Sequence, residues 1–288
     1  MDRLAFSNRW MFNRVMCQEG ICRQVIEAAF GLEVERIDYL NAEQAFEPGA
    51  ETRGVRMDVV AKGDGRVYDI EMQVANRGSL GKRMRYYQSI LDTTGLGRGE
   101  DYERLPQSFI LFVCCADPFG VGLPVYTLRR TCLEAPSLDV DEGSCWKVLN
   151  ACAWERAHDP VVGDLLEYLQ TGVAEGALSR EIDGLVGSYN EDWKWVSRVF
   201  TLEQEMALER RHAKEEGIEQ GREEGRAEGR AEGREEGREE GREEGREEGM
   251  SRLAALTAHL VGEGRSDDIV RVSEDPAFRD RLFVEFGI

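Results

Sequence analysis

Apolar residues near the start of the chain recur at intervals of three and four positions. The residues that follow this spacing are Met11, Phe12, Val15, Met16, Val25, Ile26, Ala29 and Phe30. Such spacing is typical of helices that bury one side against a core. The pattern predicts a helix or a pair of helices over residues 8–30, ended by Gly31.

The next stretch of the chain has the patterns of strands around one helix. A first strand is expected over residues 34–40, and residues 54–74 hold two β-rich runs around a Gly-Asp-Gly turn, which predicts a hairpin. Residues 79–94 return to helical spacing, and the uninterrupted apolar run 108–115 is typical of a central strand covered on both faces. The order strand, helix, strand predicts a right-handed parallel crossover.

The second half of the chain changes character. Helical spacing predominates over residues 145–213, and glycine then occupies every fourth position from Gly217 to Gly249. Two short amphipathic helices are expected after the repeats. The predicted parts are an α/β core over residues 1–150, a helical extension over 151–213, a spacer of Glu, Arg and Gly repeats over 214–249, and a small helical unit over 250–288.

The glycine repeats weaken an isolated helix. Nine glycines in a helix interior cost about 8 kcal/mol relative to alanine, whereas five Glu–Arg pairs spaced three residues apart return only about 1 to 2.5 kcal/mol. A lone helix is therefore not expected unless a partner pairs with it. Two alternatives remain open: a solvated spacer, or a homo-oligomer formed through segment 214–249 by close-packed glycines and Glu–Arg pairs between chains.

Composition and charge narrow the classes of function. The 288 residues include 56 acidic and 37 basic side chains, and the formal net charge of −19 argues against a protein that coats nucleic acid through bulk charge. Because there is no apolar run of 18 residues and no apolar signal core, the chain is expected to be cytoplasmic and to have no membrane partner. Seven cysteines without a CxxC motif and three histidines fit neither a disulfide framework nor a zinc site.

The hairpin carries the residues that point to chemistry. Because side chains alternate along a strand, Glu71 and Gln73 share one face of the second hairpin strand. If the Asp-Gly pair forms a two-residue turn, Asp58 lies opposite Glu71 and the two carboxylates stand about 5 Å apart. A three-residue loop would instead place Asp58 opposite Ile70 and break the pair. The Asp-Gly sequence favours the first register.

Two carboxylates at this distance need a proton, a cation or an arginine beside them when they are partly buried. Oxygen ligands suit Mg²⁺ or Mn²⁺ better than zinc, and such an ion polarises a phosphate and lowers the pKa of a bound water. The following stretch, from Met72 to Leu91, holds four basic residues and no acid. They are Arg77, Lys82, Arg83 and Arg85. This local positive charge favours contact with a phosphodiester, and the alternative is a solvated helix face.

Several strings of the sequence together resemble a known family. They are MFNRVM, GVRMDVV, YDIEMQV, KRMRYYQSILD, GEDYERLPQSFILFV and DPFG. Over roughly residues 6–130 the chain is similar to the Rpn-type recombination-promoting nuclease and transposase family of the PD-(D/E)XK superfamily. The resemblance implies a restriction-endonuclease-like core, a mixed sheet flanked by helices, that cuts DNA with a divalent metal. It also implies that Asp58 is the first acid of the motif, that Glu71 is the second, and that Gln73 takes the place usually held by lysine.

The sequence therefore predicts a Mg²⁺- or Mn²⁺-dependent DNA endonuclease linked to recombination or transposase-like activity. The expected metal ligands are Asp58 and Glu71, and Gln73 completes the catalytic set by orienting a water. The four basic residues named above are the expected DNA contacts. Alanine in place of either acid is expected to abolish cleavage without unfolding the protein, since side chains on a polar strand face do not pack. The alternative is a non-catalytic DNA-binding or protein-interaction module with an idle nuclease site and a self-associating tail.

Overall fold

The computed structural model of the chain describes residues 3–46, 54–76, 78–140 and 142–288. The chain divides into two compact units, Met1–Glu203 and Gln204–Ile288. None of the helices in the described ranges combines the length and the apolar content that crossing a bilayer requires.

Two helices form the N-terminal part of the first unit. α1 spans Arg9–Met16 and α2 spans Glu19–Phe30. The side chain of Asn8 accepts the backbone N–H of Trp10 at 3.0 Å and so caps α1. α2 ends at Gly31, whose φ of 65° is the left-handed conformation that glycine adopts without strain. The predicted pair of helices and its glycine end are confirmed.

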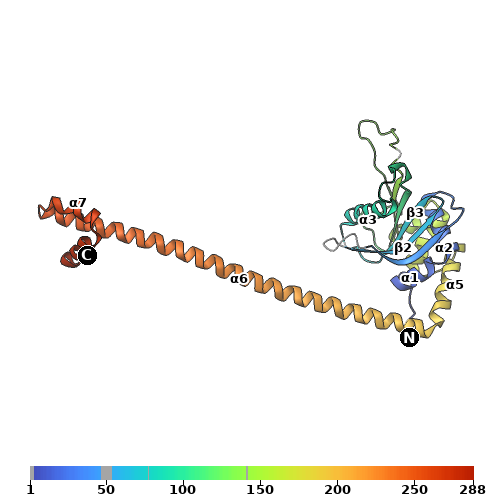
Figure 1. Cartoon of the computed structure of the whole chain (residues 1–288). Coiled ribbons are helices and arrows are strands. Elements are labelled where there is room, and N and C mark those ends of the chain that lie inside the picture. The colour runs from blue at the N-terminus through green and yellow to red at the C-terminus, as the bar shows by residue number, and fades with distance from the viewer. Residues whose placement is uncertain (1–2, 47–53, 77, 141) are drawn as a thin grey trace. The chain divides into compact units, whose positions relative to one another are not determined.

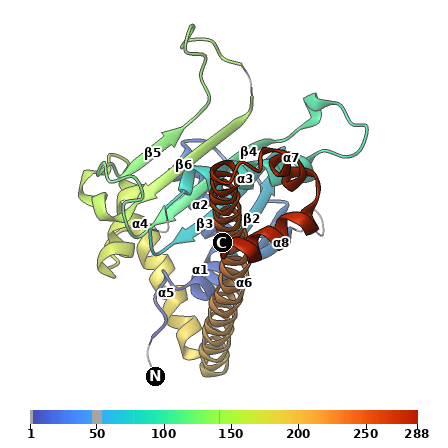
Figure 2. The same ribbon diagram turned by 90° about the vertical axis from the view of Figure 1, so that its left-hand side faces the viewer.

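Six strands form one mixed sheet in the order β1-β2-β3-β4-β6-β5. The strands are β1 Tyr39–Phe46, β2 Val55–Gly63, β3 Arg66–Gln73, β4 Gln107–Cys114, β5 Val125–Leu128 and β6 Ser144–Asn150. β1, β2 and β3 are antiparallel neighbours, β3, β4 and β6 run parallel, and β5 pairs antiparallel with β6 at one edge (Figures 1 and 2). A mixed sheet flanked by helices is the α/β class that the sequence predicts.

The hairpin of β2 and β3 has the register expected from its turn. Gly63 pairs with Arg66, and the two residues between them, Asp64 and Gly65, have φ angles of 53° and 72°. These left-handed values are those of a type I′ turn, which matches the twist of the flanking strands. α3 (Leu80–Gly95) then connects β3 to its parallel neighbour β4. The predicted hairpin and the predicted parallel crossover are confirmed.

Two expectations about strands are wrong. The first strand begins at Tyr39 instead of residue 34, so the chain enters the sheet later than its apolar residues suggest. β6 begins at Ser144 and occupies the start of the range 145–213, which helical spacing assigned to helices. The buried residues of β6 do not alternate along the strand, so the sequence carries no two-residue period there. The helices that follow are η2 (Ala151–Arg156), α4 (Pro160–Thr171), α5 (Ala177–Glu191) and α6 (Trp193–Gly262).

Helices cover both faces of the sheet. Alternate residues of the strands pack in two cores, one with α1, α2, α4 and α5 and the other with α3 (Figure 1). Tyr68 and Leu111 belong to the first core, whereas Val67 and Phe112 belong to the second. Because Glu71 lies four positions after Val67 on the same strand, its side chain faces α3.

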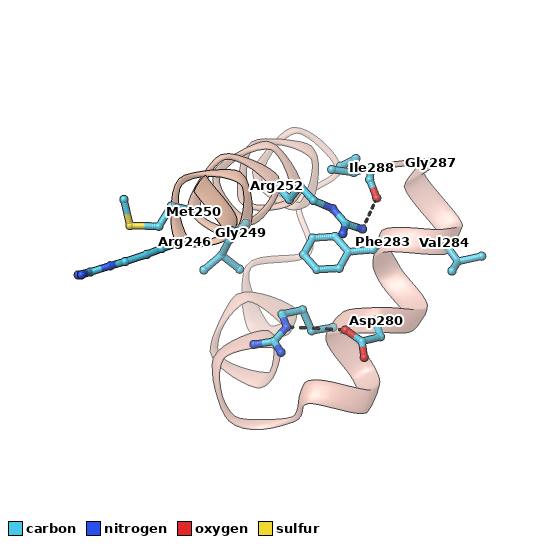
Figure 3. Close-up of a pocket in the computed structure, with 12 residues that line it drawn as sticks. Arg246, Gly249, Met250, Arg252, Asp280, Phe283, Val284, Gly287 and Ile288 are labelled. Atoms are coloured by element: carbon cyan, nitrogen blue, oxygen red, sulfur yellow. Dashed lines mark hydrogen bonds and ion pairs between the residues drawn. The ribbon is translucent and has the colours of Figure 1, made fainter. Parts of the chain in front are cut away.

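The second unit has a small core of its own. The end of α6 packs with α7 (Ser266–Glu274) and α8 (Pro276–Phe286). The buried residues of this core are Leu256, Leu260, Val272 and Leu282. A groove of about 820 Å³ lies between α6 and α8, where Arg252 packs over the ring of Phe283 and donates to the carbonyl of Ile288 at 2.7 Å (Figure 3).

The glycine repeats are helical throughout. α6 includes all of them, and every residue from 207 to 255 is exposed. The structure therefore differs from the expectation that a lone helix would not form here. No burial within the described chain offsets the low helix propensity of the glycines, so propensity alone does not account for this helix.

Candidate active site

Two carboxylates cross-link β2 and β3 where the paired part of the strands ends. The pairing of the strands reaches Val59 and Ile70. Beyond it, the backbone N–H of Asp58 donates to Glu71 Oε1 at 2.8 Å, and the backbone N–H of Met72 donates to Asp58 Oδ2 at 3.1 Å. Each carboxylate therefore replaces a backbone acceptor on the neighbouring strand. This arrangement confirms the predicted placement of Asp58 beside Glu71.

Both acids are buried. The exposed fraction is 7% for Asp58 and 1% for Glu71, and it is 6% for Gln73. The premise that these residues lie on an exposed polar strand face is wrong. Alanine at position 71 would leave two donors without their acceptor, the backbone N–H of Asp58 and one N–H of the Arg83 guanidinium, which costs about 1 to 3 kcal/mol for each unpaired group. Isosteric amides are therefore the appropriate substitutions at both acids.

Arg83 brings α3 into the site. Its guanidinium donates to Glu71 Oε2 at 2.5 Å and to Gln73 Oε1 at 2.7 Å. Its Nε donates to the hydroxyl of Tyr87, one turn further along α3, at 3.1 Å. The arginine side chain is 33% exposed, whereas its partner carboxylate is almost fully enclosed. Glu71, Gln73 and Arg83 are therefore brought together by the structure, with the cation on the outer side.

A second arginine approaches the site from α1. Arg9 Nε lies 3.5 Å from Asp58 Oδ1 and 3.3 Å from Glu43 Oε1. Glu43 sits in β1 between residues that pair with β2 on either side of Asp58, and its φ is 58°. A left-handed conformation of a residue other than glycine costs about 1 to 3 kcal/mol, and it occurs at functional sites as well as in turns. Glu43 is therefore a third acid beside the pair.

Burial controls the protonation of the pair. Desolvation, followed by the negative charge of Asp58, raises the pKa of Glu71 to about 8, although Arg83 opposes the shift. Desolvation also raises the pKa of Asp58, while Arg9 and the N–H of Met72 lower it. Both shifts have the same cause, which is negative charge enclosed in a poorly solvated space. A cation that entered this space would be stabilised by both carboxylates.

A further acid, Asp69, lies deeper on the same strand face. It is 0% exposed, and neither carboxylate oxygen has a hydrogen-bond partner among the described residues. Desolvation, together with the charges of Glu71 and Asp58, raises the pKa of Asp69 well above its ordinary value. Its surroundings therefore favour the neutral form of this carboxyl group.

The remaining predicted DNA contacts are placed differently from Arg83. Lys82 and Arg85 are exposed on α3. Each residue turns an α-helix by about 100°, so Lys82 lies about 100° and Arg85 about 200° from Arg83 around the helix axis. The side chain of Arg85 therefore points away from the acids. Arg77 lies outside the described residues. Of the three basic residues that the structure describes, Arg83 lies beside the carboxylates, and the DNA-binding role of all four stays a prediction.

The donor set fits a hard divalent cation. Asp58 and Glu71 offer carboxylate oxygens, and Mg²⁺ is commonly held by one or two protein carboxylates together with waters and substrate phosphates. Within the ranges that the structure describes, no group of three or more acidic, cysteine or histidine side chains is arranged to hold a metal ion. The pair alone is the candidate, and its buried negative charge is what a divalent cation would neutralise.

Sequence reasoning missed two of the residues that shape this site. Arg9 lies at the start of α1, far from the hairpin in sequence, and a single arginine in an amphipathic helix carries no local signal. Glu43 falls in a strand that the sequence misplaced. Asp69 was visible, because it alternates with Glu71 along one strand, but the absence of a partner for it depends on packing.

Comparison with known proteins identifies one family for the first part of the chain. Residues 6–117 match the model of the PD-(D/E)XK nuclease family transposase, and this range runs from α1 to the end of β4. No curated protein and no solved structure matches the chain. The matched range includes both carboxylates, Gln73 and Arg83, and it agrees with the resemblance seen in the sequence. Residues 6–117 are therefore a domain of the PD-(D/E)XK nuclease family of transposases.

Proposed function

We propose that the chain is a metal-dependent DNA endonuclease that hydrolyses phosphodiester bonds in a recombination or transposase-like process. The family supports a nuclease-like or transposase-related function. The observation that carries the finer proposal is the crosswise pair of Asp58 and Glu71, which are buried and each hydrogen-bonded to the other's strand. Each acid accepts one backbone N–H of the neighbouring strand, and the negative charge enclosed there suits a cation.

Each residue of the site has a separate role in the proposed reaction. Asp58 and Glu71 would hold a Mg²⁺ or Mn²⁺ ion, and the chemistry that such an ion would supply is to neutralise charge on the phosphate and to lower the pKa of a water. Gln73 orients that water through its side-chain amide. Because an amide does not accept a proton at neutral pH, a phosphate oxygen of the substrate is the acceptor. Arg9 and Glu43 keep Asp58 in place from the opposite face.

Contacts with DNA come from the basic stretch after β3. Arg83 is beside the carboxylates and is the candidate for the scissile phosphate. Lys82 and Arg85 project from other sides of α3 and suit neighbouring phosphates, and Arg77 belongs to the same stretch. Because the chain has a formal net charge of −19, this attraction is local, and binding is expected to weaken steeply with salt.

A plasmid-nicking assay tests the proposal. Supercoiled plasmid is incubated with the full-length protein in Mg²⁺, Mn²⁺ or EDTA, beside Asp58→Asn and Glu71→Gln. Cleavage is expected with either ion, and it should fall at least about a hundredfold in each variant and in EDTA, because loss of a charged group from the reacting centre costs several kcal/mol. Glu103→Gln, which removes an exposed carboxyl group, is the control. Cleavage that persists in both site variants would refute the proposal.

A second candidate is supported by the ion pair itself. Gln73 stands where the general pattern of the PD-(D/E)XK superfamily has lysine, and Arg83 contacts Glu71 directly. A site in which an arginine occupies the carboxylate that would bind the metal ion suits a DNA-binding or protein-interaction module that does not cut DNA. DNA binding by the purified protein, without nicking in either divalent ion, would favour this candidate over the nuclease.

A further inference from the structure

The contacts of Arg83 fix its guanidinium in one orientation. The group lies 4.8 Å from the ring centre of Phe112 and 5.1 Å from that of Tyr87. Its three hydrogen bonds reach two elements, β3 and α3. A phosphate-binding arginine on an open helix surface needs none of these contacts. The site therefore holds Arg83 beside Glu71 as a preorganised cation.

The two oxygens of Glu71 have separate tasks. Oε1 accepts the backbone N–H of Asp58 and so holds the hairpin together. Oε2 accepts from Arg83. Each oxygen keeps a second lone pair, and a divalent ion that binds Oε2 would share this oxygen with the guanidinium. Two cations that share one oxygen in a poorly solvated space repel each other strongly, so binding of the ion and the contact with Arg83 oppose each other.

Gln73 gives the arginine a neutral partner. The side-chain Oε1 of Gln73 accepts from Arg83 at 2.7 Å. A lysine at position 73 would place a second positive charge against the guanidinium and would remove this acceptor. The combination of glutamine on β3 and arginine on α3 therefore moves the positive charge of the site from the strand to the helix.

We infer that Arg83 is an exchangeable cation of the site. It neutralises Glu71 while no divalent ion is bound, leaves Oε2 when the ion binds, and then directs its charge to the substrate phosphate from its anchors on Tyr87 and Gln73. This inference rests on the proposed metal site and deepens it, because it assigns to α3 the charge that the general superfamily pattern expects from position 73. Arg83 and the metal ion thus compete for the free site and act together on the substrate.

The test is metal affinity, measured without DNA. Mn²⁺ is titrated calorimetrically into the full-length protein and into Arg83→Met, which keeps length and ring contact but not charge. The methionine variant should bind Mn²⁺ about tenfold more tightly, equivalent to about 1.4 kcal/mol, and should cleave plasmid more slowly. Arg83→Lys should stay near the affinity of the unmodified protein. Arg98→Met, which removes an exposed charge beyond α3, should change nothing.

Tighter Mn²⁺ binding together with slower cleavage in Arg83→Met distinguishes an exchangeable cation from a structural residue. If Arg83 had only a structural role, its removal would weaken Mn²⁺ binding, and if it contacted only DNA, its removal would leave Mn²⁺ binding unchanged. Either result overturns the exchange. The proposed nuclease site would still stand, provided that Glu71→Gln abolishes Mn²⁺ binding. No Mn²⁺ binding in any variant, or binding that survives Glu71→Gln, overturns both. If the methionine variant does not fold, Arg83→Gln carries the same expectation, because it also lacks the charge.

Discussion

Asp69→Asn should remove part of the pH dependence of stability. Asp69 is fully enclosed in the centre of the sheet, opposite Val60 on β2 and Ile110 on β4, and its pKa is raised well above the ordinary value, first by desolvation and then by the nearby acids. In the unfolded chain an aspartate loses its proton near pH 4. Asp69 therefore holds its proton more tightly in the folded state than in the unfolded state.

The sign and the size of the effect follow from proton linkage. A group that retains its proton only when folded makes the free energy of unfolding decrease as the pH rises, by about 1.4 kcal/mol for each pH unit between its two pKa values. Asparagine has the same shape and does not ionise. The stability of Asp69→Asn minus that of the unmodified protein should therefore increase by up to about 1.4 kcal/mol per pH unit above pH 4. A constant offset from the new amide does not affect this slope.

Urea denaturation at pH 5, 6 and 7 in EDTA measures the slope. All five tryptophans lie in the first unit, so their fluorescence reports the unfolding of the part that contains Asp69. Glu103→Gln is the control, because it removes an exposed carboxyl group. Parallel slopes for Asp69→Asn and the unmodified protein would refute the reasoning, because they would mean that Asp69 is ionised in the folded state.

Three further predictions concern other parts of the molecule. Mg²⁺ at a hundred times its dissociation constant should stabilise the first unit by about 2.7 kcal/mol, and Glu71→Gln should abolish the shift in Tm. Gly63→Ala should lower stability by about 1 to 3 kcal/mol or more, because its Cβ would lie 1.9 Å from the carbonyl oxygen of Arg36; Gly20→Ala, which meets no atom within 4 Å in α2, should have no such cost. Sedimentation should show an oligomer for the full chain and a monomer after deletion of residues 214–249; equal states of association would contradict self-association through the repeats.

The hairpin was predictable because its determinants are local. A two-residue Asp-Gly turn fixes the register, and the register then fixes which side chains meet across the strands. Asp58 and Glu71 follow from this argument alone, as does their position opposite one another. The crossover through α3 was equally predictable, because it depends only on the order of the strands and the helix along the chain.

The protection of the acids was not predictable from local pattern. Alternation assigns Glu71 to a face of β3 but does not say that α3 and Arg83 will cover that face. Arg9 reaches Asp58 from α1 across a large sequence separation, and Glu43 depends on the register of β1, which the sequence misplaced. Burial of charge is a property of tertiary packing, so the pKa shifts that follow from it were out of reach as well.

The repeat helix presents the opposite case, in which local energetics and structure disagree. Nine glycines cost about 8 kcal/mol relative to alanine, and the helix between residues 207 and 255 buries nothing that could offset this cost. A second copy of the segment would supply both burial and Glu–Arg pairs between chains, and glycines allow two helix backbones to approach closely.

Four residues turn an α-helix by about 400°, so the glycine stripe moves around the helix by about 40° per repeat. A straight pair of helices would therefore bring only about three consecutive glycines into contact, because further repeats turn away. A pair that used all nine would have to wind with a right-handed twist, since its repeat is longer than 3.6 residues per turn.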